Sequence, residues 1–233
     1  MKKGIQPSGL LTRRKLLSAS VKVFLEKGYE RATAKEIAEL AGVSTGAPFL
    51  LFGNKEGVLL ELVKQMFAGQ FDTAEKLAGP EADPLLLYAV ETGLQLHITE
   101  LSEPLRELYV TAYTLPSTAD YIYEQMVARL EYIFTPYLPQ LERKDFYELE
   151  VASAGVTRSF MAKPCDLYFT MERKLRRYLS CCYKLYEVPP ERYRPVIEQA
   201  QAMELKSMAG LIIAQTAQAA EAGFEAVMAE GAE

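Results

Sequence analysis

The chain has 233 residues, of which 49% are hydrophobic and 24% charged, and its formal net charge is −5. This composition is typical of a globular protein with a sizeable core, and the length suits one large domain or a small one joined to a larger one. Three cysteines without a Cys-x-x-Cys spacing disfavour a disulfide framework or a zinc cluster and favour a reducing cytoplasm. No apolar run approaches the ~20 residues of a membrane helix, and no signal peptide is expected.

Two helices are predicted first along the chain. Thr12 can cap a helix with apolar residues at three- and four-residue intervals, and Gly28 supplies a left-handed stop. Thr33 and Glu36 have the spacing of a capping box, which predicts a second, short helix that ends at Gly42. The tight turn that Gly42 permits is the turn of a helix-turn-helix, although an αα-corner without a ligand has the same pattern.

A third and a fourth helix follow this turn. The third is expected to open at Ser44 or Thr45 and to run to about Phe52, and Pro48 is tolerable only in its first turn. Asn54 can cap the fourth helix, which is longer and connects this region to the rest of the chain.

Prolines and capping residues divide the remaining chain into further helices, and convincing period-two strands are absent. A short helix restarts at Ser102 and Pro104. The other helices are expected at about 84–100, 118–135, 144–162, 167–187 and 195–229. The alanine- and glutamate-rich tail continues the last helix until it frays. The chain is therefore predicted to be all-α, with nine or ten helices.

Charge is divided unevenly along the chain. Residues 1–66 hold 11 Lys and Arg against 6 Asp and Glu, a balance of +5, whereas the other residues hold 15 against 25, a balance of −10. A small basic segment on a larger acidic one suits a region that faces phosphate, joined to a body with another task. Chance fluctuation is the alternative explanation.

Several landmarks then occur in a specific order and spacing: Phe24, EKGYERAT (26–33), IAELAGVSTG (37–46), Phe52 and NKEGVLLEL (54–62). On them, residues 12–63 resemble the DNA-binding domain of the TetR family of bacterial transcriptional regulators. The resemblance implies a helix-turn-helix DNA-binding domain over residues 10–70 and a larger helical effector-binding and dimerisation domain over 71–233. It covers about a quarter of the chain in motif detail and the helical remainder only in outline.

The resemblance also implies which residues face a double-stranded DNA operator. Thr33 and the backbone amides beside it are expected to lie near phosphate, because a helix N-terminus attracts anions. Lys55, at the start of the fourth helix, is expected to contact phosphate. The other candidates lie on or near the groove face: Ser44, Thr45, Gly46, Ala47, Phe49, Leu50 and Leu51.

This groove face departs from the family pattern. Phe49 stands where the family usually has a tyrosine, and Leu51 where a tyrosine or histidine commonly touches phosphate. Leu50 and Leu51 offer contacts to thymine methyl groups but no hydrogen bonds. Three interpretations stay open: an A·T-rich site; binding through phosphates, DNA shape and a basic arm; or an apolar helix that binds a protein partner instead. The basic arm comprises Lys2, Lys3, Arg13, Arg14 and Lys15.

The acidic body contains candidate effector-binding residues. Tyr109 and Tyr113 lie four residues apart on one helix face, and a mostly apolar cavity with a few hydroxyl groups is what a small organic effector needs. An aromatic core without a cavity and a core role for the lone His97 are the alternatives. The full candidate set is Tyr88, His97, Tyr109, Tyr113, Tyr123 and Met126. No catalytic triad, metal-ligand spacing or phosphate loop is recognisable, so neither an enzyme nor a cofactor is expected.

A homodimer completes the prediction. Ala152, Ala154 and Gly155 allow close helix approach, and the resemblance implies that subunits pair through late helices, so about 144–187 is the expected interface. The expected function is that of a ligand-responsive regulator, most often a repressor in this family. The alternative is a regulator-like dimer that acts through protein contacts of its apolar helix.

Overall fold

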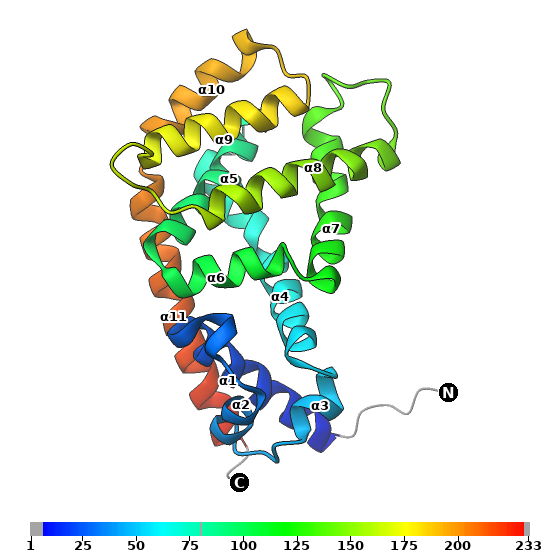
Figure 1. Cartoon of the computed structure of the whole chain (residues 1–233), viewed down its shortest axis with the longest axis vertical. Helices are drawn as coiled ribbons and strands as arrows, with labels where there is room; N and C mark the ends of the chain where they lie inside the picture. The colour runs from blue at the N-terminus through cyan, green and yellow to red at the C-terminus, as the bar shows by residue number, and fades with distance from the viewer. Residues whose placement is uncertain (1–6, 80, 231–233) are drawn as a thin grey trace.

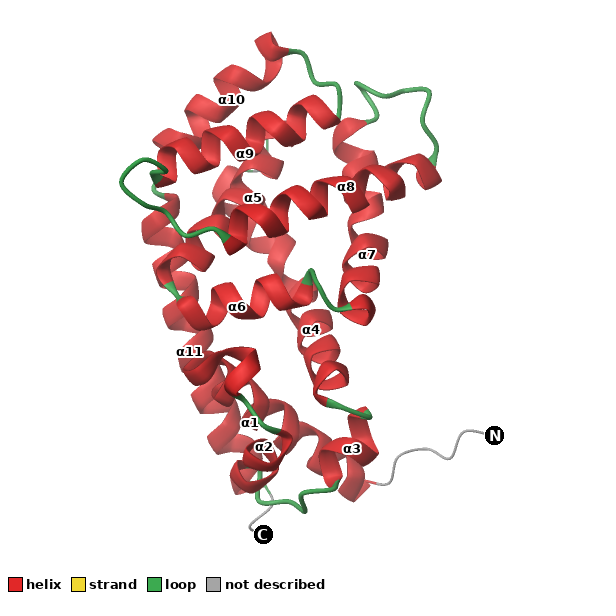
Figure 2. Ribbon diagram, viewed as in Figure 1, coloured by secondary structure: helices red, strands yellow, loops and turns green. Residues whose placement is uncertain are grey.

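The computed structural model of the chain describes residues 7–79 and 81–230, and every regular element among them is a helix (Figure 2). The eleven helices of this part of the chain are α1 (Pro7–Arg31), α2 (Ala34–Leu40), α3 (Ala47–Phe52), α4 (Lys55–Ala78), α5 (Pro84–Leu101), α6 (Glu103–Ala112), α7 (Pro116–Phe134), α8 (Arg143–Ala162), α9 (Met171–Leu185), α10 (Pro190–Ala202) and α11 (Leu205–Ala229). The all-α prediction is confirmed.

The helices α1, α2, α3 and the start of α4 form a small head at one end of the molecule (Figure 1). Predicted caps fix its helix starts: Thr33 Oγ1 accepts a hydrogen bond from the Glu36 amide at 3.1 Å, and Asn54 Oδ1 accepts one from the Gly57 amide at 2.8 Å. Gly42 has φ +64° in the turn after α2, which a residue with a Cβ adopts only at a cost.

Three predicted boundaries were wrong. The first helix begins at Pro7, earlier than predicted, while Gly28 interrupts its regular backbone (φ +78°) as predicted and a short helical segment continues to Arg31. The third begins at Ala47, after Gly46, which places Pro48 in its first turn, where a missing amide costs nothing. The helix predicted over 195–229 is two helices, because the backbone is extended at Met203 (ψ 149°).

The body packs around α5, most of which is buried. α4, α10 and α11 lie against it, together with α6, α8 and α9. Asp83 caps α5 by accepting a hydrogen bond from the Leu85 amide at 2.9 Å, and the Tyr183 hydroxyl donates to the Leu85 carbonyl at 2.7 Å. Burial of these apolar helix faces provides the main stabilisation of the body.

The C-terminal helix α11 leaves the body and runs alongside α1 to the far end of the head (Figure 1). Ion pairs tie the two helices together: Lys22 Nζ lies 2.8 Å from Glu221, and Arg14 Nη1 lies 2.6 Å from Glu230. Head and body are therefore joined by two helices, α4 and α11. No helix in the described ranges has both the length and the apolar character needed to cross a bilayer.

Candidate nucleic-acid interface and ligand cavity

The short helix α3 presents two bare apolar side chains. Leu50 is 87% exposed and Phe49 is 57% exposed, while Leu51 is half-buried and packs against the core of the head. Ala47 was predicted on the groove face, but it is buried, because it lies on the side of α3 that packs against the core. The outward face of α3 is thus narrower than predicted.

Polar groups surround this face on the segments before α3. Thr33, Ser44, Thr45 and Gly46 are all exposed. The Thr33 hydroxyl is occupied as the cap of α2, so the remaining free amides of that helix start are the groups available to an anion. The structure therefore places the predicted small polar residues at the solvent face around α2 and α3.

Lys55 has an internal role. Its ammonium group donates to the carbonyl oxygens of Tyr29 at 2.9 Å and Ala32 at 3.1 Å, and it lies 4.2 Å from the centroid of the Tyr29 ring. These carbonyls belong to the end of α1 and the segment after it, where a cation is favourable. The predicted phosphate contact of Lys55 would have to compete with these bonds.

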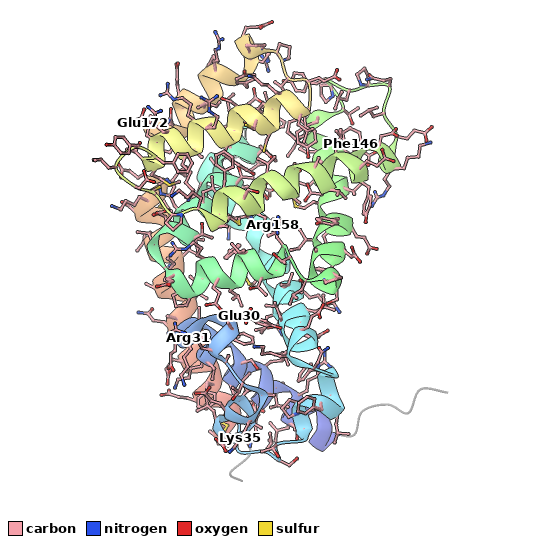
Figure 3. The ribbon with its side chains drawn as sticks, in the orientation of Figure 1. Glu30, Arg31, Lys35, Phe146, Arg158 and Glu172 are labelled. Carbon is pink, nitrogen blue, oxygen red and sulfur yellow. The ribbon has the colours of Figure 1, made fainter. Side chains whose placement is uncertain are left out.

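The structure describes only part of the predicted basic arm, and the arginines in that part form ion pairs within the protein. Lys2 and Lys3 lie outside the described residues. Arg13 lies within α1, pairs with Glu61 and stacks 5.0 Å from the Phe52 ring centroid, and Arg14 pairs with Glu230. These two guanidinium groups therefore form ion pairs with carboxylates from other parts of the protein. By contrast, the Lys35 side chain is 75% exposed and lies at the lower end of the head, with Glu39 3.8 Å away (Figure 3).

A cavity of about 710 Å³ lies between the head and the body. Its volume falls in the range of about 300–1,000 Å³ that is usual for small-molecule sites. Side chains from α1, α4, α5, α6 and α11 line it, and most of them are apolar. Representative lining residues are Leu17, Val21, Phe24, Leu62, Leu94, Leu105, Tyr109, Ile212 and Ala220. A molecule in this cavity would touch the head through α1 and the body through α5 and α6.

A buried carboxylate interrupts the apolar lining. Glu91 on α5 is 4% exposed, and its Oε2 accepts a hydrogen bond from Arg129 Nε at 3.4 Å. No group in the described part of the chain hydrogen-bonds its other oxygen, Oε1, which is buried. Burial raises the pKa of Glu91 to about 7, although Arg129 opposes the shift.

The predicted effector residues divide into two groups. Tyr109 lines the cavity, and Tyr109 and Tyr113 together line a second, nearly filled space beside it that Leu59 and Ile122 also border. The structure therefore brings this pair of tyrosines together at the head–body junction, as the four-residue spacing predicted.

The other four candidates line neither space. Tyr88 is enclosed by the Phe134, Tyr183 and Tyr186 rings in the body core. His97 is half-buried, and burial lowers its pKa, with Lys206 adding to the effect. Tyr123 packs against Tyr147, and Met126 is half-buried and packs against the core. Periodicity predicted that these residues lie inside but did not show which helix faces enclose a void.

The sequence reasoning missed the walls that α5 and α11 provide. Glu91 is the one carboxylate in the otherwise uncharged run PLLLYAVETGLQL (84–96), which was a signal for a buried functional group. Gln95, four residues later, also lines the cavity. The contribution of α11 had no comparable signal, since its alanine-rich sequence specifies no partner.

Comparison with known families matches residues 16–62 to the bacterial regulatory proteins of the tetR family. The head therefore contains a DNA-binding domain of the TetR family. Within the matched region, α2, the turn and α3 correspond to the helix-turn-helix, and α4 connects it to the body.

Curated relatives match the chain over the same region. The fatty acid metabolism regulator protein of Bacillus subtilis is 36% identical over 78 residues, which cover 31% of this chain and 40% of that protein. The transcriptional regulator TtgR of Pseudomonas putida is 37% identical over 79 residues, 32% of this chain and 36% of that protein. The match thus spans less than half the length of these relatives.

Solved structures resemble the chain over much more of its length. RolR in complex with resorcinol has a TM-score of 0.66 at 13% identity, covering 82% of this chain and 95% of that chain. FadR of Thermus thermophilus in complex with lauroyl-CoA has a TM-score of 0.56 at 21% identity, covering 75% and 92%. At these identities the likeness shows the fold alone.

Proposed function

We propose that this TetR-family protein is a ligand-responsive DNA-binding regulator of transcription in the cytoplasm, and that it acts as a repressor which a small organic molecule releases. The observation that carries the proposal is the position of the cavity. Because α1 of the head and α5, α6 and α11 of the body all line it, a bound molecule would contact both parts. The curated relatives are named as transcriptional regulators, a class that is not enzymatic.

The DNA-binding half of the proposal rests on the outward face of α3. Leu50 would contact thymine methyl groups in the major groove, and Ser44 and Thr45 would supply hydroxyl groups to phosphate or base edges. Such a surface favours A·T-rich sequences and relies on DNA shape, because few side chains on it can make bidentate hydrogen bonds.

The proposed assembly is a homodimer through α8 and α9, which cross the front of the body in Figure 3, where Arg158 and Glu172 are labelled. Four large apolar side chains within 144–187 are exposed: Tyr147, Val151, Leu167 and Tyr168. Covering them against a second copy would remove apolar surface from water and would hold two heads at the fixed spacing of an operator's half-sites.

The proposed mechanism is a shift between two arrangements of the heads. A molecule that fits the cavity in only one arrangement lowers operator affinity by its coupling free energy, which is typically about 1–3 kcal/mol. Contacts across the junction supply the parts that would rearrange. In one of them, Glu56 on α4 accepts hydrogen bonds from the amide and hydroxyl groups of Ser117, at 3.2 and 2.6 Å.

The test is selection of duplexes from a random pool by the purified protein, followed by affinity measurements with two variants. Leu50→Asp places a carboxylate against the duplex and is expected to weaken binding by at least about tenfold, or 1.4 kcal/mol. Leu211→Asp makes the same change on the 55% exposed Leu211 of α11 and should leave affinity unchanged. Equal affinity of wild type and Leu50→Asp would exclude α3 as the reading helix.

A second candidate function follows from the same exposed pair, Phe49 and Leu50. An apolar helix of this kind also suits a protein partner, in which case the dimer would act through protein contacts. If selection enriches no duplex, while Leu50→Asp abolishes a stable complex with a protein from the same cell, this second function replaces the first.

A further inference from the structure

The unpartnered oxygen of Glu91 identifies the polar end of the cavity. Oε1 is buried and accepts no hydrogen bond within the described chain, although the Glu91 side chain lines a space of about 710 Å³. A buried acceptor without a partner costs free energy, and a ligand that donates a hydrogen bond to it would remove that cost. The partner that is missing is a hydrogen-bond donor.

The charges beside Glu91 favour a positively charged donor. Among the described residues, two carboxylates lie beside the Arg129 guanidinium: Nη1 is 2.9 Å from Glu75 and Nε is 3.4 Å from Glu91. With both acids ionised, the group carries one excess negative charge, which a cationic ligand would neutralise. An anionic ligand would be repelled by Glu91, and a neutral donor would complete its hydrogen bonding but leave the excess charge.

The remaining walls define the rest of the molecule. Leu17, Val21, Leu94, Leu105 and Ile212 offer only hydrocarbon to the cavity. Arg14, a basic lining residue, pairs with Glu230 at 2.6 Å and so adds no uncompensated positive charge. Ser18, Gln65, Gln95 and Thr216 add a few uncharged polar groups, so the lining suits a largely apolar molecule with a single charged end.

We propose that the cavity binds a hydrophobic organic cation whose ammonium or amidinium group donates to the free oxygen of Glu91. This assignment names the effector class of the regulator proposed above and rests on that proposal only for the step from binding to DNA release. A cation bound beside the carboxylate would lower the raised pKa of Glu91 again.

The test uses two probes of nearly equal shape, 4-phenylbutylamine and 4-phenylbutan-1-ol, titrated into the full-length protein by calorimetry without DNA at mildly alkaline pH. The amine is expected to bind at least about tenfold more tightly than the alcohol. Glu91→Gln keeps the size of the side chain and removes its charge, and it should weaken amine binding by at least about tenfold while leaving alcohol binding unchanged.

Two further variants test whether amine binding depends on Glu91 in particular and on this cavity. Glu150→Gln is a matched control, because Glu150 is also 4% exposed but lies outside this cavity and accepts a hydrogen bond from the Ser153 hydroxyl at 2.8 Å; it should bind the amine as wild type does. Ala220→Leu fills the cavity from α11 and should abolish amine binding with Glu91 intact. Circular dichroism verifies that each variant is folded.

Equal binding of amine and alcohol, or amine affinity unchanged in both Glu91→Gln and Ala220→Leu, would overturn the assignment. A separate titration of the protein–DNA complex with the amine keeps this result distinct from the proposed function. Amine binding through Glu91 without any change in DNA affinity would support the ligand class and contradict the sensing role. DNA binding without amine affinity would contradict the ligand class and leave the proposed DNA-binding function supported.

Discussion

At the scale of single residues, Lys55 is a stabilising group as well as a candidate for phosphate. Its ammonium joins the start of α4 to two carbonyl oxygens at the end of α1. Removing a charged donor from such bonds typically costs about 1.5–3 kcal/mol. Lys55→Ala is therefore expected to lower the free energy of unfolding by about that amount in urea titrations.

Lys35→Ala is the matched control for this prediction, because the Lys35 side chain is 75% exposed and its ion pair with Glu39 lies on the surface of α2. The expected change is below about 0.5 kcal/mol. If both lysine variants unfold at the same denaturant concentration as wild type, Lys55 does not hold α1 and its phosphate role becomes the simpler explanation.

Glu150 gives the body a dependence on pH. Burial raises its pKa in the folded protein to about 8, while the unfolded value is the ordinary one. The folded state thus keeps a proton that the unfolded state loses, so stability is complete below the unfolded pKa and declines as pH rises towards the folded one. The slope is on the order of 1 kcal/mol per pH unit.

The measurement is the free energy of unfolding of wild type and Glu150→Gln between mildly acidic and mildly alkaline pH. Because glutamine does not titrate, the variant should gain stability relative to wild type as pH rises. A constant difference between the two proteins across this interval would show that Glu150 titrates normally.

Residue patterns predicted the caps well and the site only in part. Thr33, Asn54 and Ser102 act where the sequence placed them, because a cap is a local arrangement of a few neighbouring residues, whereas Thr12 lies inside α1. The lining of the cavity depends on how five helices meet, and a helical period shows that Tyr88 and Tyr109 are inward but not that only Tyr109 borders a void.

At the scale of helices, the kink at Gly28 connects the head to α6. The backbone there has φ +78° and ψ 177°, a region that is nearly exclusive to glycine, and a Cβ would overlap the Glu107 carboxylate. Gly28→Ala is expected to cost about 1–3 kcal/mol of stability, measured by thermal or denaturant unfolding.

Gly46→Ala provides the comparison. Gly46 has φ −83° and a Cβ would meet no atom within 4 Å, so stability should change by less than about 0.5 kcal/mol. Equal effects of the two substitutions would mean that α1 does not need this kink in order to reach α6.

The helix α11 shows the limit of prediction at this scale. The break at Met203 was not foreseen, because no proline or glycine marks it and the alanine-rich segment after it favours helix throughout. The packing of α11 along α1 depends on contacts of Lys22 with Phe224 and Glu221. The Lys22 ammonium lies 4.8 Å from the Phe224 ring centroid. Contacts between residues so far apart in the chain leave no periodic signal.

At the scale of the whole molecule, the proposed dimer makes a direct prediction. Val151 is 43% exposed on α8, and Val151→Arg would place a like charge from each copy into the interface. Sedimentation should show wild type as a dimer and the variant as a monomer. Tyr132→Arg, at a 65% exposed position on α7, should remain dimeric. A monomeric wild type at micromolar concentration would remove the fixed spacing of the heads.

The most direct measurement of the proposed DNA binding is the affinity of the wild-type protein for a duplex from upstream of its own gene over a range of salt concentrations. Neutralising several phosphates at two half-sites should make the logarithm of the affinity fall linearly with the logarithm of salt concentration, at two protomers per site. No measurable affinity at any salt concentration, or affinity that does not depend on salt, would contradict a DNA-binding regulator.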